Sequence, residues 1–169
     1  MQDNTDINTT SGKNIAEVMG INDKVQLAEM EREYQRDQAE KLMRQGGTWR
    51  DPRRVDIRGD VTVGKDVEID VNVIFEGTVK LGDRVSVGAG SILRAAVVND
   101  DVTIKAYCVI EEANIGAACQ IGPFARIRPE TRLEENVHIG NFVEVKKSHI
   151  DKGSKVNHLS YIGDTTMGS

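Results

Sequence analysis

The sequence lacks several features that would mark particular classes of protein. It has no excess of positive charge, because 22 lysines and arginines face 27 aspartates and glutamates, and the net charge is -5. This balance indicates no surface for nucleic acid, which proteins bind through clustered basic residues. No run of about 18 apolar residues is present, and the polar N-terminus lacks the apolar segment of a secretion signal, so we expect no membrane span and no export.

Cysteine is also scarce, with Cys108 and Cys119 as its two examples. Both fall at inward positions of the repeat described below, on different sides of adjacent coils, which favours buried free thiols over a disulfide. Unpaired thiols are typical of reducing compartments. We therefore expect a cytoplasmic protein.

The sequence does contain an aliphatic or aromatic residue that returns every six positions from Ile57 to Ile162. The step shortens to five after Leu93, Ile110 and Val145, at intervals that are multiples of three repeats. This spacing indicates a three-sided coil of 17 or 18 residues. Hexapeptide repeats of this kind are typical of a parallel β-helix, in which each side is a short strand and successive coils stack.

A second column supports the same interpretation. The residue two positions before each aliphatic one is small or β-branched, as at Val67, Ala96 and Thr131. Glycine often follows the aliphatic residue, as at Gly64 and Gly140, where a Cβ would crowd a tight corner. A sandwich of alternating strands is the competing interpretation, and the near-constant register makes it improbable. Hexapeptide proteins usually wind left-handed, so we expect a mainly β protein with a left-handed parallel β-helix.

The residues before the repeat predict a long α-helix. Residues 1–14 are polar and without period, and we interpret them as a tail. The segment 15–47 contains helical spacing of apolar residues over 22–45, with Asn22 as the expected cap and glycines after it as the stop. The β-helix domain should then occupy 48–169, with Trp49 packed beneath its first coil.

Chemistry is suggested by one column of the repeat. Residues one coil apart stack about 4.8 Å from each other. The position after every third aliphatic residue should therefore form a ladder that holds Glu76, Arg94, Glu111, Arg128, Lys146 and Gly163. The signs alternate until Arg128 and Lys146, two cations in succession. Like charges opposite each other are destabilising. Either these side chains extend into water or an anion holds them together, and an Arg fork with a Lys point charge suits a phosphate.

Three further side chains surround these cations in the predicted register. Glu144 and Tyr161 fall on the same side, and His158 falls on the neighbouring side of the next coil. A histidine near a carboxylate suits general-base chemistry near neutral pH, although a lone surface histidine is more often only polar. The three histidines do not predict a zinc site, because His138 and His149 fall too far from His158 for one subunit to gather all three.

Three segments together resemble a known enzyme family. They are GINDKVQLAEMEREYQRDQAEKLM, DVEIDVNVIFEG and IGPFARIRPETRLEENVHIGNFVEVKKSHIDKGSKVNHLSYIGD. They closely resemble the bifunctional N-acetylglucosamine-1-phosphate uridyltransferase / glucosamine-1-phosphate N-acetyltransferase, and the resemblance covers roughly residues 15–168. It implies a left-handed β-helix that forms a homotrimer and acetylates glucosamine 1-phosphate with acetyl-CoA. The product serves UDP-N-acetylglucosamine, peptidoglycan and lipopolysaccharide synthesis.

The resemblance also implies roles for individual residues. Arg128 in ARIRP and Lys146 in EVKK match the residues that hold the sugar phosphate, and Tyr161 matches a substrate-contacting tyrosine. His158 in KVNHLSYIGD matches the general base, with Glu144 supporting its imidazolium. Asn22 in GIND matches a magnesium ligand of the uridyltransferase domain.

The sequence departs from the family in what it omits. The uridyltransferase domain and its glycine-rich nucleotide loop are absent, so we expect that activity and its magnesium to be missing. The β-helix stops before the later coils, which in the family carry most of the acetyl-CoA site. We therefore expect an incomplete acetyltransferase that is inactive alone. Another hexapeptide acyltransferase and a non-catalytic trimerisation module are the alternatives.

Overall fold

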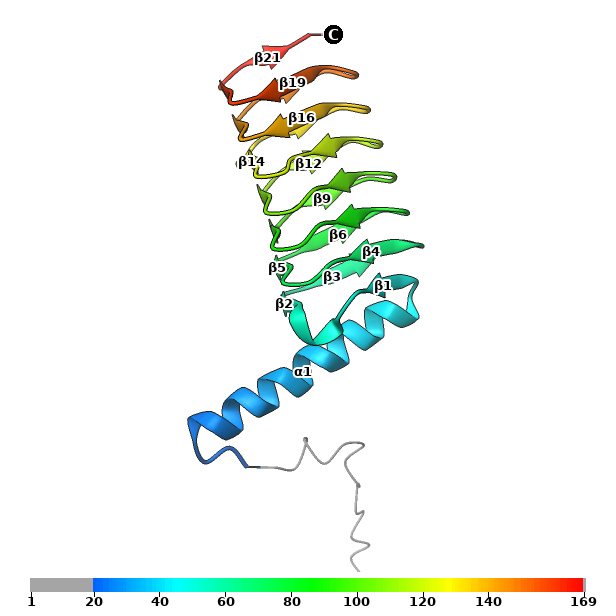
Figure 1. Ribbon diagram of the computed structural model, residues 1–169, viewed down its shortest axis with the longest axis vertical. Helices are drawn as coiled ribbons and strands as arrows, with labels where there is room; N and C mark the ends of the chain where they lie inside the picture. The colour runs from blue at the N-terminus through cyan, green and yellow to red at the C-terminus, as the bar shows by residue number, and fades with distance from the viewer. Residues whose placement is uncertain (1–19, 169) are drawn as a thin grey trace, which may run out of the picture. The chain divides into compact units, whose positions relative to one another are not determined.

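The computed structural model describes residues 20–168, and the expected tail over 1–14 lies outside them. One helix, α1 (Lys24–Arg44), precedes a stack of short strands (Figure 1). The helix predicted over 22–45 is thus confirmed to within two residues, but its cap is Asp23, whose Oδ1 accepts hydrogen bonds from the backbone of Val25 and Gln26. Asn22 instead donates its backbone N–H to Gln26 Oε1. No helix in the described part is long and apolar enough to cross a membrane.

The strands form three seven-stranded parallel sheets, here named A, B and C. Sheet A contains β1 (Gly47–Trp49), β4 (Val67–Ile69), β7 (Ser86–Val87), β10 (Thr103–Ile104), β13 (Gln120–Ile121), β16 (His138–Asn141) and β19 (Lys155–His158). Sheet B contains β2 (Asp56–Arg58), β5 (Ile74–Glu76), β8 (Ile92–Arg94), β11 (Val109–Glu111), β14 (Arg126–Ile127), β17 (Glu144–Lys146) and β20 (Tyr161–Gly163). Sheet C contains β3 (Val61–Val63), β6 (Val79–Leu81), β9 (Val97–Val98), β12 (Asn114–Ile115), β15 (Arg132–Leu133), β18 (His149–Ile150) and β21 (Thr166–Met167).

The chain visits the three sheets in turn, and a short 3₁₀ helix, η2 (Pro52–Arg54), joins the first strand to the second. The fold is a parallel β-helix of about seven turns, as the hexapeptide period predicts, and it is left-handed, as expected from other hexapeptide proteins. The repeat starts earlier than the sequence suggested, because β1 pairs with β4 before the first aliphatic position at Ile57. By its contacts the chain divides into two compact units, Met1–Tyr34 and Gln35–Ser169, and this division falls inside α1.

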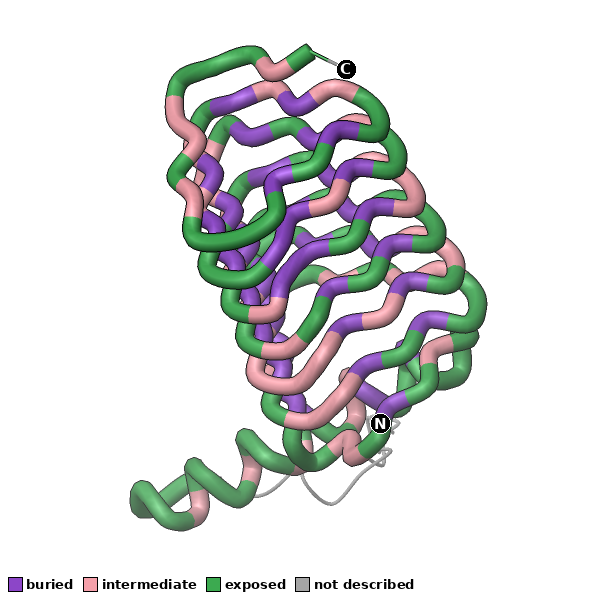
Figure 2. Tube along the Cα trace, turned by 45° about the horizontal axis from the view of Figure 1, so that its top comes forward, coloured by how far each residue is buried: buried purple, intermediate pink, exposed green. Residues whose placement is uncertain are grey.

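The core lies inside the coil and is built from the two predicted columns. Along most strands a buried residue alternates with intermediate or exposed ones, as the colours of the tube show (Figure 2). Phe75, Ile110 and Ile139 are examples of the aliphatic or aromatic column, and all are fully buried. Of the predicted positions in this column, Val63 and Ile162 alone are partly exposed. The period predicts burial correctly because it fixes which side of every strand faces the interior.

The first turn of the coil is covered by the second half of α1. The Gln35 side chain makes the two hydrogen bonds that a neighbouring strand would otherwise make. Its Nε2 donates to the carbonyl of Ile57 at 3.0 Å, and its Oε1 accepts from the Ile57 N–H at 2.6 Å. Ala39 and Leu42 join the hydrophobic core, and Trp49 is buried there as predicted. A backbone edge that would otherwise lack partners is thereby satisfied within the buried interior.

Glycine is required for close approach at the predicted corners. A Cβ at Gly140 would lie 1.3 Å from the carbonyl oxygen of Asn157 on the next coil. Neither Gly140 nor Gly64 has a positive φ, and that conformation falls instead on non-glycine corner residues such as Tyr107 and Phe124. Glycine is needed at these corners because the coils stack too closely to leave room for a Cβ.

Candidate functional site

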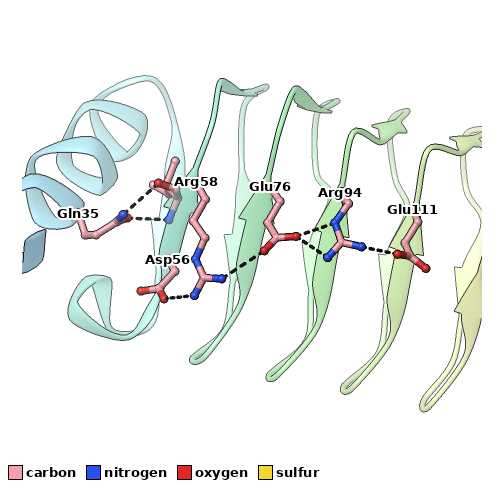
Figure 3. A network of polar contacts seen from close by, with 7 residues as sticks. Gln35, Asp56, Arg58, Glu76, Arg94 and Glu111 are labelled. Carbon is pink, nitrogen blue, oxygen red and sulfur yellow. Dashed lines mark hydrogen bonds and ion pairs between the residues drawn. The ribbon is translucent and has the colours of Figure 1, made fainter.

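Sheet B carries a continuous charge ladder on its outer face, as Figure 3 shows for its first rungs. Arg58 donates to Glu76 at 3.2 Å, and Arg94 Nε donates to the other oxygen of Glu76 at 2.6 Å. Arg94 also bonds Glu111, which in turn accepts from Arg126 Nη2 at 3.2 Å. Glu76 and Glu111 therefore each bridge two guanidinium groups, one on the preceding coil and one on the following coil.

The ladder shifts the pKa values of Glu76, Arg94 and Arg58. The hydrogen bond from Arg94, followed by its charge and that of Arg58, holds the pKa of the Glu76 carboxyl below its usual value. Glu76 raises the pKa of Arg94 in return, and Asp56 raises the pKa of Arg58. The lowered pKa of Glu76 and the raised pKa values of Arg94 and Arg58 keep these three groups charged at neutral pH.

The two cations that break the alternation lie next to each other in register, as predicted. Arg128 and Lys146 directly follow Ile127 and Val145, which pair across β14 and β17. Each cation nevertheless has its own carboxylate: Arg128 Nη1 lies 2.9 Å from Glu144 Oε1, and Lys146 Nζ lies 3.3 Å from Asp164 Oδ2. The expectation that only water or a bound anion would relieve their repulsion is therefore wrong, because two carboxylates of the chain already do so.

Of the remaining candidate residues, Glu144 contacts Arg128, whereas Tyr161 begins β20 and His158 ends β19. Glu144 of β17 pairs directly with Tyr161 of β20 in sheet B. His158 ends β19 in sheet A, opposite Asn141 of β16, and both His158 and Tyr161 are exposed. Two neighbouring sheets thus bring these side chains to one corner of the coil. Within residues 20–168 the imidazole of His158 has no hydrogen bond or ion pair, and Glu144 contacts Arg128 instead.

Sequence reasoning missed Asp164, although the repeat contains a signal for it. Asp164 directly follows Gly163, which pairs with Lys146 on the neighbouring coil. Its backbone N–H donates to the Lys146 carbonyl at 3.0 Å, and its carboxylate reaches the Lys146 ammonium. Extending the column by one residue beyond the register partner of each cation would have identified it.

The histidines and Asn22 form no metal site in the described part of the chain. His138 lies in sheet A and His149 in sheet C, where His149 Nε2 is 2.9 Å from Glu134 Oε1. No group of three or more His, Cys, Asp or Glu side chains within residues 20–168 could hold a metal ion. Asn22 is exposed, and one amide oxygen does not make a magnesium site.

The cysteines are free and buried, as predicted. Burial raises the pKa of Cys108 above its usual value and raises the pKa of Cys119 to about 11. Both thiols therefore stay protonated at neutral pH, and neither is activated as a nucleophile.

An exposed aromatic column follows the corner between sheets A and B. The rings of Tyr107, Phe124 and Phe142 stack on three successive coils, with centroid distances of 5.3 Å and 5.2 Å. Leu159 continues the column beside His158 and is 75% exposed. Most of the large apolar side chains that the β-helix exposes therefore lie along one corner, which ends at the candidate site.

Three solved structures share features of this fold. A proposed acetyltransferase from Bacillus cereus is 15% identical, with 70% of this chain and 75% of that chain covered and a TM-score of 0.46. The UDP-N-acetylglucosamine acyltransferase of Francisella novicida is 14% identical, with 66% and 51% covered and a TM-score of 0.38. The acetyltransferase domain of PglB from Neisseria gonorrhoeae, solved with acetyl coenzyme A, is 24% identical, with 68% and 55% covered and a TM-score of 0.26. The chain spans about half the length of the last two proteins. Likenesses of this size establish neither a shared activity nor a shared ligand.

A family match is more informative. The sequence model of the GMPPB C-terminal domain matches residues 57–150. This range includes Arg128, Glu144 and Lys146 and ends before His158, Tyr161 and Asp164. Because the match covers more than half of the 169 residues, the chain belongs to the family of the GMPPB C-terminal domain.

Proposed function

We propose that this chain is a hexapeptide acyltransferase part that binds glucosamine 1-phosphate and takes part in acetyl transfer from acetyl-CoA to its amine. One observation carries the proposal: two cations, a carboxylate and a tyrosine occupy adjacent register positions of sheet B, next to an exposed histidine at the end of β19. These are the residues for which the sequence resembles the glucosamine-1-phosphate N-acetyltransferase family. The product would enter UDP-N-acetylglucosamine and cell-envelope synthesis.

Each residue has a defined part in the proposed reaction. Arg128 and Lys146 hold the phosphate, and this fixes the distance of the sugar amine from His158. His158 takes a proton from the amine, and Glu144 supports the imidazolium that results. The amine nitrogen forms a bond to the thioester carbonyl carbon, the C–S bond breaks, and coenzyme A leaves as a thiolate that is then protonated. Tyr161 contacts the substrate. No covalent enzyme intermediate is required, which agrees with the protonated, buried thiols.

The proposal includes a homotrimer in the cytoplasm and no step through a metal. The exposed aromatic column beside His158 supports burial against a second copy, since large exposed apolar patches commonly mark interfaces. The unpaired cysteines support a reducing compartment. Asn22 retains its proposed link to magnesium only as part of a uridyltransferase domain.

Calorimetric titration with glucosamine 1-phosphate tests the substrate assignment. We expect Lys146→Ala to weaken binding at least about tenfold, because it removes one of the two phosphate cations. The matched control is Lys80→Ala, which removes an exposed lysine from the outer face of sheet C. Equal affinity of the Lys146→Ala variant and the unchanged chain would refute the proposed phosphate site. Another amine acceptor bound in preference to glucosamine 1-phosphate would favour a different hexapeptide acyltransferase.

Coenzyme A release from acetyl-CoA tests the catalytic assignment. Turnover that His158→Ala abolishes would support His158 as the base. Binding of glucosamine 1-phosphate without turnover would support the proposed sugar-phosphate site. Absence of both, with a stable trimer in sedimentation, would favour the non-catalytic trimerisation module.

A further inference from the structure

The two ion pairs at the candidate site differ from the rest of the sheet B ladder. Glu76 and Glu111 each bridge two guanidinium groups, and their side chains are 24% and 13% exposed. Within residues 20–168, Glu144 and Asp164 each pair with one cation, and their side chains are 36% and 54% exposed. A carboxylate with one partner and open access to water is more easily replaced than one locked between two coils.

The charges at the site cancel in this arrangement. Arg128 and Lys146 contribute two positive charges, and Glu144 and Asp164 contribute two negative charges at 2.9 Å and 3.3 Å. A phosphate that approaches both cations would meet both carboxylates at short range, and that repulsion opposes binding. Guanidinium and ammonium groups form strong charge-assisted hydrogen bonds with phosphate oxygens, so the carboxylates have to give way for the ligand to bind well.

We propose that Glu144 and Asp164 are internal counter-ions of the phosphate site, which a phosphate monoester displaces from Arg128 and Lys146. This inference rests on the proposed function and adds a positioning role for Asp164. Asp164 holds the Lys146 ammonium when no ligand is bound, and it sets how tightly the site binds phosphate.

The same exchange explains how Glu144 can serve two roles. Its carboxylate contacts Arg128 in the free protein, on the strand that pairs with β20. Once phosphate oxygens occupy Arg128, the Glu144 carboxylate is released beside Tyr161 and becomes available to an imidazolium at His158. Phosphate binding and support of the base are thereby linked through one side chain.

Asp164→Asn separates this exchange from ordinary surface effects. Asp164 has a φ of 49°, a conformation that asparagine adopts readily, so the backbone corner is retained. Asp164→Gly removes the same charge with a residue that also suits this φ, and it guards against an effect of the amide itself. The matched control is Glu135→Gln, which breaks the exposed pair of Glu135 Oε2 with Lys152 Nζ at 2.6 Å.

Titrations with inorganic phosphate and with glucosamine 1-phosphate give the readout. We expect both Asp164 variants to bind each ligand about three- to tenfold more tightly than the unchanged chain at low ionic strength. The gain should shrink as salt screens the charges. Glu135→Gln should bind as the unchanged chain does.

Two contrary results have different meanings. If the unchanged chain binds glucosamine 1-phosphate and the Asp164 variants bind it equally or more weakly, the counter-ion role is refuted and the proposed function stands. If neither the unchanged chain nor the variants bind either ligand, the phosphate site and the inference built on it are both refuted.

Discussion

The two halves of sheet B use the same outward row in different ways. From Arg58 to Arg126 the row is one connected network, in which Glu76 and Glu111 each pair with arginines of the preceding and the following coil. From Arg128 to Asp164 it consists of separate pairs, and two cations follow each other in register. The backbone is the same parallel ladder throughout, so the difference comes from the side chains alone.

This contrast shows how a repeat protein can carry a stabilising charge network and a candidate ligand site on different parts of the same sheet. Stacked coils of alternating charge satisfy each other and leave little for a ligand. A break in the alternation leaves cations whose partners are single and exposed, and such partners can exchange with an external anion. The break coincides with the arrival of His158 and Tyr161 at the neighbouring corner.

The largest effect should come from breaking the second half at its backbone. Gly140→Ala places a Cβ on the carbonyl oxygen of Asn157, which adjoins His158. Overpacking of this kind should lower the free energy of unfolding by about 3 kcal/mol, because β16 and β19 can no longer stack at their normal distance. Thermal unfolding would measure the loss of stability, and titration with glucosamine 1-phosphate would measure the loss of binding. Gly20→Ala, where a Cβ meets open space, is the control. An unchanged melting temperature for Gly140→Ala would contradict the observed coil spacing.

A smaller loss of stability is expected at the first coil, where the first half of sheet B begins. Gln35→Ala leaves the N–H and carbonyl of Ile57 without the partners that cover them, in a buried position. Unsatisfied buried groups of this kind cost about 2 kcal/mol, measurable by chemical denaturation. Binding of glucosamine 1-phosphate should stay unchanged, because the site lies in the other half. Gln38→Ala, on the same helix, should change stability much less. Equal losses for the two variants would show that the Gln35 bonds do not stabilise the coil.

The aromatic column runs past the point where the two halves of sheet B meet, and its contribution to stability and association can be tested at its central ring. Phe124→Ala removes the central ring and both of its stacking contacts, at an expected cost of about 1 kcal/mol in thermal unfolding. Glu130→Ala is a matched control, since Glu130 occupies another corner of similar φ and stacks on no ring. Sedimentation of the Phe124→Ala variant should also show weaker self-association if this column is an interface. A variant as stable and as associated as the control would argue that the column has neither role.

The smallest effect should be the pH dependence of the connected network. The pKa of Glu76 is lowered in the folded chain, so its pairing stabilises the fold above the unfolded pKa of about 4.3 and is lost as pH falls through the folded value. Glu76→Gln should therefore flatten the acid side of the stability profile, measured as melting temperature against pH. Glu68→Gln, whose carboxylate makes no ion pair within residues 20–168, should leave that profile as it is. Identical profiles for the two variants would contradict the stabilising role of the ladder.

Much of the fold could be read from the sequence because the period is regular. Ile110 and Ile139 face inward since a six-residue repeat fixes their side of every strand, and no long-range information is needed. The neighbours in the column from Glu76 to Lys146 followed from the same count. Gln35 could not be predicted in this way, because its bonds to Ile57 join residues that no repeat relates.

The candidate site was predicted in part for a similar physical reason. The register placed Arg128 beside Lys146 and Glu144 beside Tyr161, and the structure has both arrangements. The partner of each charge was not predictable, since long side chains choose among several neighbours within reach. The roles of these residues stay predictions.

The sequence by itself determined the coil, the three-sided register, the buried columns and the position of the broken charge alternation, because each depends on the spacing along the chain. Only the tertiary structure decided that Glu144 lies on Arg128, that Asp164 lies on Lys146 and that Gln35 completes the first coil. Those contacts depend on side-chain directions and on the part of α1 from Gln35 onward, which packs at the first coil. A repeat period does not specify either.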